Sequence, residues 1–272
     1  MSDQVGNRTD EMSFGEHLDA LRPHLMRICG VFFLLLIASF CFKEILVDTL
    51  LFGPMKASFP TNQLFAKFAE MTGIAELNIN AQTVPLINTS LSGQFNLHLK
   101  IAMLTAFTLG FPYLLWEVWR FVKPALSQQE LSGCRQFVFY VSLCFFIGLS
   151  FGYFIIAPLT INFLAGYSVS TAISNLIDVN SYLATVIDVS LACAVVFQLP
   201  LCVYFLTRMG ILTSTFLKHY RRHAVVVLAL LSAIITPPDV FSMILVLLPL
   251  YGLYEYSISL SARVEHRYFS NS

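Results

Sequence analysis

The chain has 272 residues, of which 57% are hydrophobic and 12% are charged, whereas an average soluble domain carries about 25% charged residues. This composition is typical of a membrane protein. The 16 basic and 16 acidic residues cancel, so no overall positive field favours binding to nucleic acid. The six cysteines contain no C-x-x-C pair, and we expect them to be packing residues rather than disulfides or metal ligands.

A polar leader precedes the first apolar run. Within it, Ser13 and Glu16 fit a capping box, and Phe14 and Leu18 fall on one helical face. We therefore predict an amphipathic helix over residues 13–24 that lies on the membrane surface with its acidic side chains turned outward. The leader lacks the basic start and the cleavage site of a secretory signal peptide, so we expect the first apolar run to be a retained span.

Six apolar runs indicate how often the chain crosses the membrane. A helix needs about 20 apolar residues to cross a hydrocarbon core of about 30 Å. Four of the runs meet that length, the first is marginal and the fifth falls short. The segment at residues 43–95 is expected to be an ordered exterior cap. We predict an all-α fold, a single membrane domain over residues 1–272 with transmembrane helices at about residues 25–42, 97–121, 137–161, 182–207, 218–236 and 239–260.

The fifth run is followed by a tight turn. The apolar part of this run, residues 224–235, covers roughly 18 Å at 1.5 Å per residue. Two prolines then end the helix within residues 236–239, and Asp239 favours the positive dipole end of the next helix. We expect the hairpin of the fifth and sixth spans to be short, and to lie in locally thinned lipid or against the bundle.

Basic residues are unevenly distributed if all six runs cross the membrane. Lys43, Lys56, Lys67 and Lys100 fall on one side, and the remaining 12 of the 16 Lys and Arg residues fall on the other. The positive-inside rule then places both termini in the cytoplasm. We expect a multi-pass protein of the cell inner membrane.

Two motifs resemble those of enzymes but are better explained by structure. Gly148, Ser150 and Gly152 match the G-x-S-x-G pattern of serine hydrolases, yet no histidine falls mid-membrane to activate the serine. The glycines are expected to form a G-x-x-x-G face for close helix packing. His219 and His223 have metal-ligand spacing, but the glutamate of H-E-x-x-H is absent. We predict no catalytic residue, metal or cofactor.

Polar residues within the apolar runs are costly to bury and tend to mark pathways or partner contacts. Glu117 and Glu255 are expected to snorkel to the inner interface. Asp188 lies nearer the outer surface, and Gln198 lies closer to the inner half of its span. A proton-coupled solute transporter using Asp188 and Glu117 is the alternative function, although no internal repeat supports it. An intramembrane protease ranks third.

Motifs in the same order as in a known family extend along nearly the whole chain. They are SFGEHLDALR from Ser13, WEVWRFVKPALSQQE from Trp116, FQLPL from Phe197, RMGI from Arg208 and ITPPDVFS from Ile235. Together they resemble the TatC family, the polytopic core subunit of the twin-arginine protein translocase. The resemblance implies a curved, glove-like bundle. It also implies a non-enzymatic receptor and scaffold, powered by the proton-motive force, for the export of folded proteins.

The resemblance further implies a binding site for twin-arginine signal peptides of folded cargo proteins on the cytoplasmic side. That site would consist of Glu130, Phe121, Leu126, Pro124, Glu16, Asp19 and Arg22. Ala20 stands where the family has a second leader carboxylate, so Glu16 or Asp19 would have to substitute. A desolvated pair between a guanidinium and a carboxylate matters by about 2 to 5 kcal/mol when one partner is removed.

A partner-binding surface is implied as well, made of Gln198, Asp239, Thr236 and Met243. Gln198 stands where the family has a glutamate and Met243 where it often has a glutamine, so this polar cluster is weaker than usual. The implied partners are single-span TatA/TatB-type subunits, the signal peptides, the lipid bilayer and further copies of the chain in a larger receptor complex. Neither nucleic acid nor a cofactor is expected.

Overall fold

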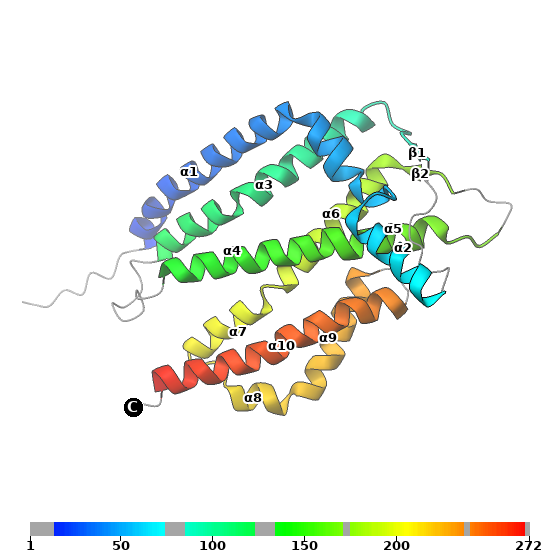
Figure 1. Ribbon diagram of the computed structural model, residues 1–272. Coiled ribbons are helices and arrows are strands. Elements are labelled where there is room, and N and C mark those ends of the chain that lie inside the picture. Colours follow the sequence, from blue (N-terminus) through cyan, green and yellow to red (C-terminus); the bar gives the residue numbers. More distant parts are fainter. Residues whose placement is uncertain (1–13, 74–84, 123–133, 171–174, 237–239, 270–272) are drawn as a thin grey trace, which may run out of the picture.

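The computed structural model describes residues 14–73, 85–122, 134–170, 175–236 and 240–269. Long helices run side by side, and α2 and the two short strands gather at one end, which we call the cap end (Figure 1). The predicted all-α membrane fold is confirmed. The described helices long and apolar enough to cross a membrane are five: Leu21–Cys41, Gly93–Phe121, Val138–Gly166, Val179–Arg208 and Ser242–His266.

Helices make up nearly all of the described chain, and only two short strands interrupt them. In chain order the elements are α1 (Phe14–Cys41), a π-helical segment (Ile45–Leu51), a 3-10 turn (Gly53–Met55), α2 (Pro60–Thr72), β1 (Leu86–Ile87), α3 (Gly93–Val122), α4 (Cys134–Phe151), a second π-helical segment (Gly152–Ile156), α5 (Ala157–Gly166), β2 (Ile177–Asp178), α6 (Val179–Val196), α7 (Leu199–Arg208), α8 (Ser214–His219), α9 (Arg221–Ile235) and α10 (Val240–Phe269).

The leader and the first span form one helix. α1 continues through Pro23, and its 28 residues cover about 42 Å at 1.5 Å per residue. The structure thus differs from the expected separate surface helix over residues 13–24. A rod of this length crosses the hydrocarbon core and extends its first turns beyond it. α1 packs along α3, its main neighbour (Figure 1).

Two glycines allow the third span to pack closely on α6. A Cβ atom on Gly148 would lie 2.8 Å from the carbonyl oxygen of Cys193, and one on Gly152 would lie 2.7 Å from the Cα atom of Ser190. A larger side chain would push the two backbones apart, so the predicted G-x-x-x-G packing face is confirmed. Packing therefore accounts for the glycines on either side of Ser150.

The fourth span breaks at Phe197 and Gln198, between α6 and α7. Pro200 lies in the first turn of α7, where its missing N–H group is tolerated but cannot bond back into the preceding turn. The N–H group of Gln198 bonds instead to the carbonyl of Val195 at 3.0 Å, in a tighter turn. This break leaves Gln198 half-buried between the two helical segments.

The predicted fifth span corresponds to α9 and is short. Its 15 residues cover about 23 Å, less than the hydrocarbon core. α10 has 30 residues and continues to Phe269, past the expected end of the last span at residue 260. The expectation that both helices of the final hairpin are short therefore holds for α9 and not for α10. α9 packs against α10 and α6.

Two apolar clusters hold the bundle together. One joins α6, α7, α9 and α10 and includes Val246 and Leu250, each 1% exposed. The other lies toward the cap end and includes Leu51, Ile101 and Leu183, each also 1% exposed. Lipid is as apolar as these side chains, so close van der Waals packing stabilises such contacts more than removal from water does.

The cap is tied to the start of α6. β1 and β2 pair in parallel, with Leu86 opposite Ile177. The Asp178 carboxylate accepts hydrogen bonds from the Thr89 hydroxyl at 2.9 Å and the Thr89 N–H group at 3.2 Å, and it also caps α6 by accepting from the N–H group of Asn180 at 2.9 Å. These bonds, the hydroxyl of Thr89 foremost, lower the pKa of Asp178 below its ordinary value. The described part of the segment at residues 43–95 therefore has a defined structure, as expected for an ordered cap.

Candidate functional site

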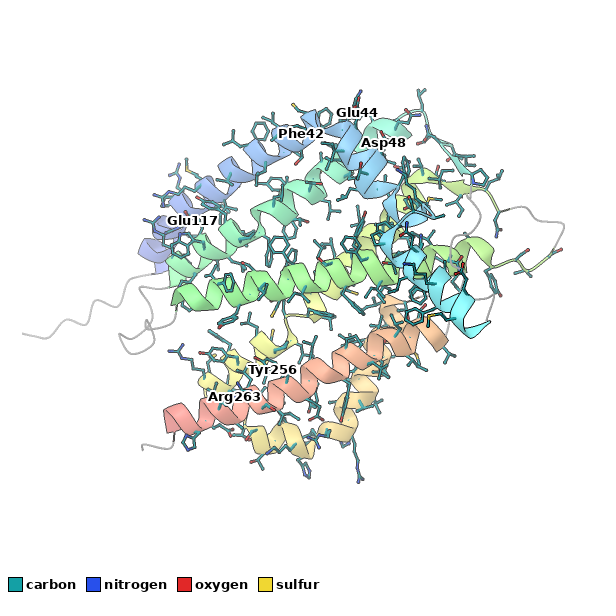
Figure 2. The ribbon with its side chains drawn as sticks, viewed as in Figure 1. Phe42, Glu44, Asp48, Glu117, Tyr256 and Arg263 are labelled. Atoms are coloured by element: carbon teal, nitrogen blue, oxygen red, sulfur yellow. The ribbon has the colours of Figure 1, made fainter. Side chains whose placement is uncertain are left out.

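A buried carboxylate joins α1 to α3 near the start of α1 (Figure 2). Glu117 is 2% exposed, and its two oxygens have different partners. The Tyr113 hydroxyl donates to Oε1 at 2.9 Å, and His24 Nδ1 lies 2.5 Å from Oε2. The Arg27 guanidinium approaches the same Oε2 at 3.9 Å. These groups offset the cost of burying the carboxylate away from water.

This geometry corrects the expectation that Glu117 snorkels to the interface. The carboxylate turns toward α1 because α1 offers it a hydrogen-bond partner. Neither His24 nor Tyr113 was singled out in the sequence. The i, i+4 spacing of Tyr113 and Glu117 was a signal for their bond. His24 lies 93 positions away from Glu117, so their contact depends on how the helices pack.

Phe121 lies about one helical turn beyond Glu117 and contacts the same histidine. The rings of Phe121 and His24 meet edge to face with their centroids 6.1 Å apart. Arg22, two positions before His24, is exposed. The part of α1 just past the leader motif therefore lies beside the end of α3, although most of the cap separates the two in sequence.

The remaining predicted residues of the signal-peptide site are described in part or not at all. Glu16 and Asp19 belong to the first turns of α1, where the structure describes the backbone and not these side chains. Pro124, Leu126 and Glu130 lie outside the described residues. Their roles stay predictions.

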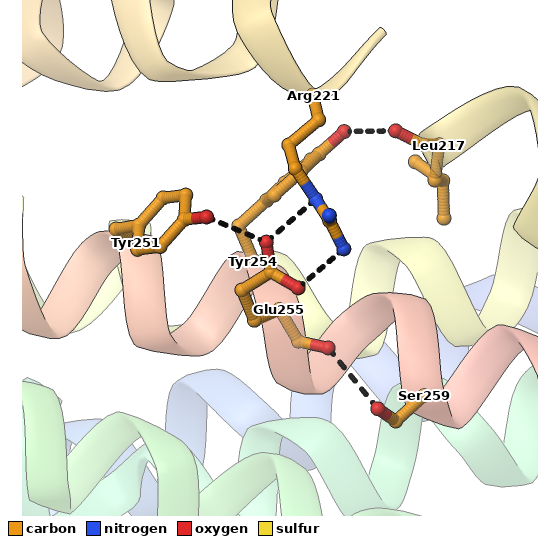
Figure 3. A network of polar contacts seen from close by, with 6 residues as sticks. All are labelled: Leu217, Arg221, Tyr251, Tyr254, Glu255 and Ser259. Carbon is orange, nitrogen blue, oxygen red and sulfur yellow. Dashed lines mark hydrogen bonds and ion pairs between the residues drawn. The ribbon is translucent and has the colours of Figure 1, made fainter. Parts of the chain in front are cut away.

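A second charged cluster joins α9 to α10 (Figure 3). Glu255 accepts from Arg221 through both oxygens, with Nε to Oε1 and Nη2 to Oε2 each at 2.8 Å, and from the Tyr251 hydroxyl at 2.8 Å. The Tyr254 hydroxyl donates to the carbonyl of Leu217 in α8 at 2.7 Å. Glu255 thus forms a bidentate ion pair where snorkelling was expected, and this pair holds the first turn of the short α9.

The predicted partner surface is brought together in part. Thr236 is buried and donates to the carbonyl of Ser232 at 2.8 Å, and the Ser232 hydroxyl donates to the carbonyl of Met243 at 2.6 Å. Gln198 lies at the break of the fourth span, where its Nε2 group donates to a carbonyl one turn earlier at 3.3 Å. Its Oε1 atom is buried, and no described residue forms a hydrogen bond with it. Asp239 lies outside the described residues.

The acids of the transporter alternative are not joined in the described part of the chain. Asp188 is exposed on α6, whereas Glu117 is held by His24 and Tyr113. Within the same residues, no group of three His, Cys, Asp or Glu side chains is arranged to hold a metal ion.

Comparison with known proteins identifies the family. Residues 16–249 match the family model described as Sec-independent protein translocase protein (TatC). The chain belongs to the TatC family. The TatC protein of Blattabacterium sp. subsp. Periplaneta americana is 35% identical over 263 residues, which cover 96% of this chain and 99% of that protein. The TatC protein of Desulforapulum autotrophicum is 36% identical over 262 residues, which cover 95% of this chain and 87% of that protein.

Solved structures of TatC share this fold. A crystal structure of the twin-arginine translocase receptor TatC in DDM gives a TM-score of 0.66 at 28% identity, covering 90% of this chain and 99% of that one. Another crystal structure of the TatC receptor gives a TM-score of 0.61 at 27% identity, covering 92% of this chain and 99% of that one. This TatC-family chain is therefore a multi-pass membrane component of the twin-arginine translocase, a non-enzymatic transport subunit.

Proposed function

We propose that this TatC-family chain is the receptor for twin-arginine signal peptides of folded cargo proteins, and the scaffold that recruits single-span TatA/TatB-type subunits. In this proposal it lies in the cell inner membrane with both termini in the cytoplasm. The observation that supports the receptor role most directly is the contact between His24 and Phe121, because it brings α1, two residues past the leader motif, against the end of α3.

The chemistry of a paired-arginine ligand suits this end of the bundle. A carboxylate at Glu130 binds a guanidinium through two parallel hydrogen bonds, which lysine cannot form because it lacks the planar fork. The Phe121 ring offers a face for a cation–π contact with a second guanidinium. In this proposal Glu16 and Asp19, which belong to the first turns of α1, add further negative charge to the site.

The receptor role is tested by replacing Glu130 with glutamine and measuring photo-crosslinking of a twin-arginine signal peptide to the full chain in membranes. We expect capture to fall at least about tenfold, because removing one partner of a desolvated charged pair costs about 2 to 5 kcal/mol. Glu70→Gln is the matched control, since Glu70 is exposed on α2 at the cap end. Unchanged capture by the Glu130 variant would remove this residue from the site.

The scaffold role is supported by the buried Oε1 atom of Gln198, which has no hydrogen-bond partner among the described residues and which a polar group on a partner's membrane helix would satisfy. Gln198→Leu should reduce the amount of single-span subunit that co-purifies with the chain. Capture of the signal peptide should stay unchanged, since Gln198 lies at the break between α6 and α7 and Phe121 lies at the end of α3. Equal co-purification of the partner by the variant and the unmodified chain would count against this surface.

A further inference from the structure

A cavity of about 280 Å³ opens between α3, α4, α6 and the two π-helical segments. Its back wall is formed by Leu51, Ile101 and Leu183, each 1% exposed. Its rim includes Leu50 and Leu109, which are 40% and 57% exposed, so the cavity opens to the side of the bundle. Its volume suits a large side chain, since a cavity of about 150 Å³ already accepts benzene.

One buried hydroxyl group in this cavity has no hydrogen-bond partner among the described residues. It belongs to Ser190, which lines the cavity and is 3% exposed. A serine within a helix often donates to the carbonyl four residues earlier, as Ser142 does to Val138 at 2.9 Å. Because a buried hydroxyl without a partner is unfavourable, the site favours an occupant that brings a polar atom.

The walls contain an uncommon backbone form. Leu50 and Leu51 come from the π-helical segment Ile45–Leu51, and Tyr153 and Phe154 come from Gly152–Ile156. π-helical turns are rare and often mark functional sites. The cavity thus lies where two helices depart from regular α-helical geometry, next to the close contact between Gly152 and α6.

We infer that this cavity receives a side chain from the transmembrane helix of a single-span partner subunit, and that a polar group on that helix bonds to Ser190. A lipid acyl chain fills the apolar volume but has no atom to pair with the hydroxyl. A second unsatisfied atom, Oε1 of Gln198, lies eight positions further along the fourth span, about 12 Å at 1.5 Å per residue. A single membrane-spanning helix that runs along α6 could contact both Ser190 and Gln198. The inference rests on the proposed scaffold role, which supplies the partner.

Photo-crosslinking tests the occupant. A benzophenone amino acid is placed at Leu109 on the rim, and in a control at Leu34, which is 69% exposed on α1 and does not line the cavity. In membranes that contain the complete translocase, Leu109 should give an adduct with a single-span subunit and Leu34 should not. Adducts at Leu109 with lipid alone, or with the signal peptide instead, would overturn the inference.

Two substitutions test the chemistry. Ser190→Ala removes a hydroxyl that has no partner within the described chain, so melting of the isolated chain should not change, while partner retention should fall about two- to threefold. Ser150→Leu fills the cavity from α4 and should reduce retention tenfold or more. Ser259→Ala is the control, because its hydroxyl bonds to the carbonyl of Glu255, away from the cavity.

Full retention by both Ser190→Ala and Ser150→Leu contradicts the inference. Signal-peptide capture is measured on the same preparations. Normal capture together with full retention rejects the cavity and leaves the receptor role intact. If Gln198→Leu also retains the partner fully, the Gln198 surface is rejected as well. The scaffold role itself is rejected if the unmodified chain retains no single-span subunit.

Discussion

His24 and Glu117 meet across α1 and α3, with Nδ1 of the histidine 2.5 Å from Oε2 of the carboxylate. The pair lies one turn from Phe121, at the end of the bundle where the signal peptide is proposed to bind. Breaking a buried pair by removing one partner leaves an uncompensated polar or charged group. The contact therefore fixes α1 against α3 beside the proposed receptor surface.

His24→Ala should lower the free energy of unfolding by about 1 to 3 kcal/mol, because the Glu117 carboxylate loses its partner on α1. Denaturant unfolding in detergent measures the change. Combining His24→Ala with Glu117→Ala should cost less than the sum of the single changes, since neither partner is then left alone. Arg22→Ala, at an exposed position of the same helix, is the control. Strict additivity would show that the two residues do not interact.

Gly152→Ala should destabilise the chain by about 1 to 3 kcal/mol, because the added methyl group would meet the Cα atom of Ser190 at 2.7 Å. Gly252→Ala in α10 is the matched control, since nothing lies within 4 Å of its added Cβ atom. That change should be neutral or stabilise by about 0.5 to 1 kcal/mol. Thermal unfolding of both variants makes the comparison, and equal melting temperatures would refute the close contact between the third span and α6.

Arg221→Ala should have a small effect, under about 1 kcal/mol, because the Arg221 and Glu255 side chains are 46% and 32% exposed and solvent screens their ion pair. Arg221→Lys should recover part of the stability that Arg221→Ala loses, since lysine keeps the charge but lacks the planar fork that reaches both carboxylate oxygens. A double-mutant cycle with Glu255→Gln measures the coupling. A coupling energy of several kcal/mol would mean that the pair is far better shielded than its exposure indicates.

Acid should loosen the cap at Asp178. The pKa of Asp178 is lowered in the folded chain by the bonds from Thr89 and Asn180. A carboxyl group whose pKa is lowered by folding stabilises the fold fully at pH values above its ordinary pKa, about 3.9. This contribution is lost as the pH falls through the lowered pKa. Thr89→Val removes the hydroxyl bond, so hydrogen exchange at the start of α6 should depend less on pH in this acid range. The same acid dependence in the variant would argue against the bond.

The spans from α3 to α9 were predictable from the sequence to within about five residues, whereas α10 continues to Phe269, past its expected end at residue 260. Apolar runs of sufficient length predicted α3, the α4–α5 run, the α6–α7 run and α10, and the short run predicted the short α9. Local spacing also predicted the packing role of Gly148 and Gly152, because residues four apart share a helix face. The leader helix was predicted as an element, but its continuity through Pro23 was not, since proline usually marks a helix boundary.

The site was predictable in part. Motifs marked Phe121 and Gln198. The partners that tie Glu117 to α1 and Glu255 to α9 come from other helices, and the rotation of each helix about its axis decides which side chains meet. The unsatisfied hydroxyl of Ser190 has no sequence signal at all, because serine is common in apolar helices and its partner is ordinarily within the same helix.

The sequence by itself determined the membrane class, the number and order of the apolar runs and the family, because a backbone in lipid must satisfy its hydrogen bonds within helices long enough to cross. The tertiary structure alone decided that His24 meets Glu117, that Arg221 meets Glu255 and that a cavity opens around Ser190. These contacts join residues far apart in the chain, and in an apolar solvent they depend on how closely neighbouring helices fit rather than on the pattern within any one of them.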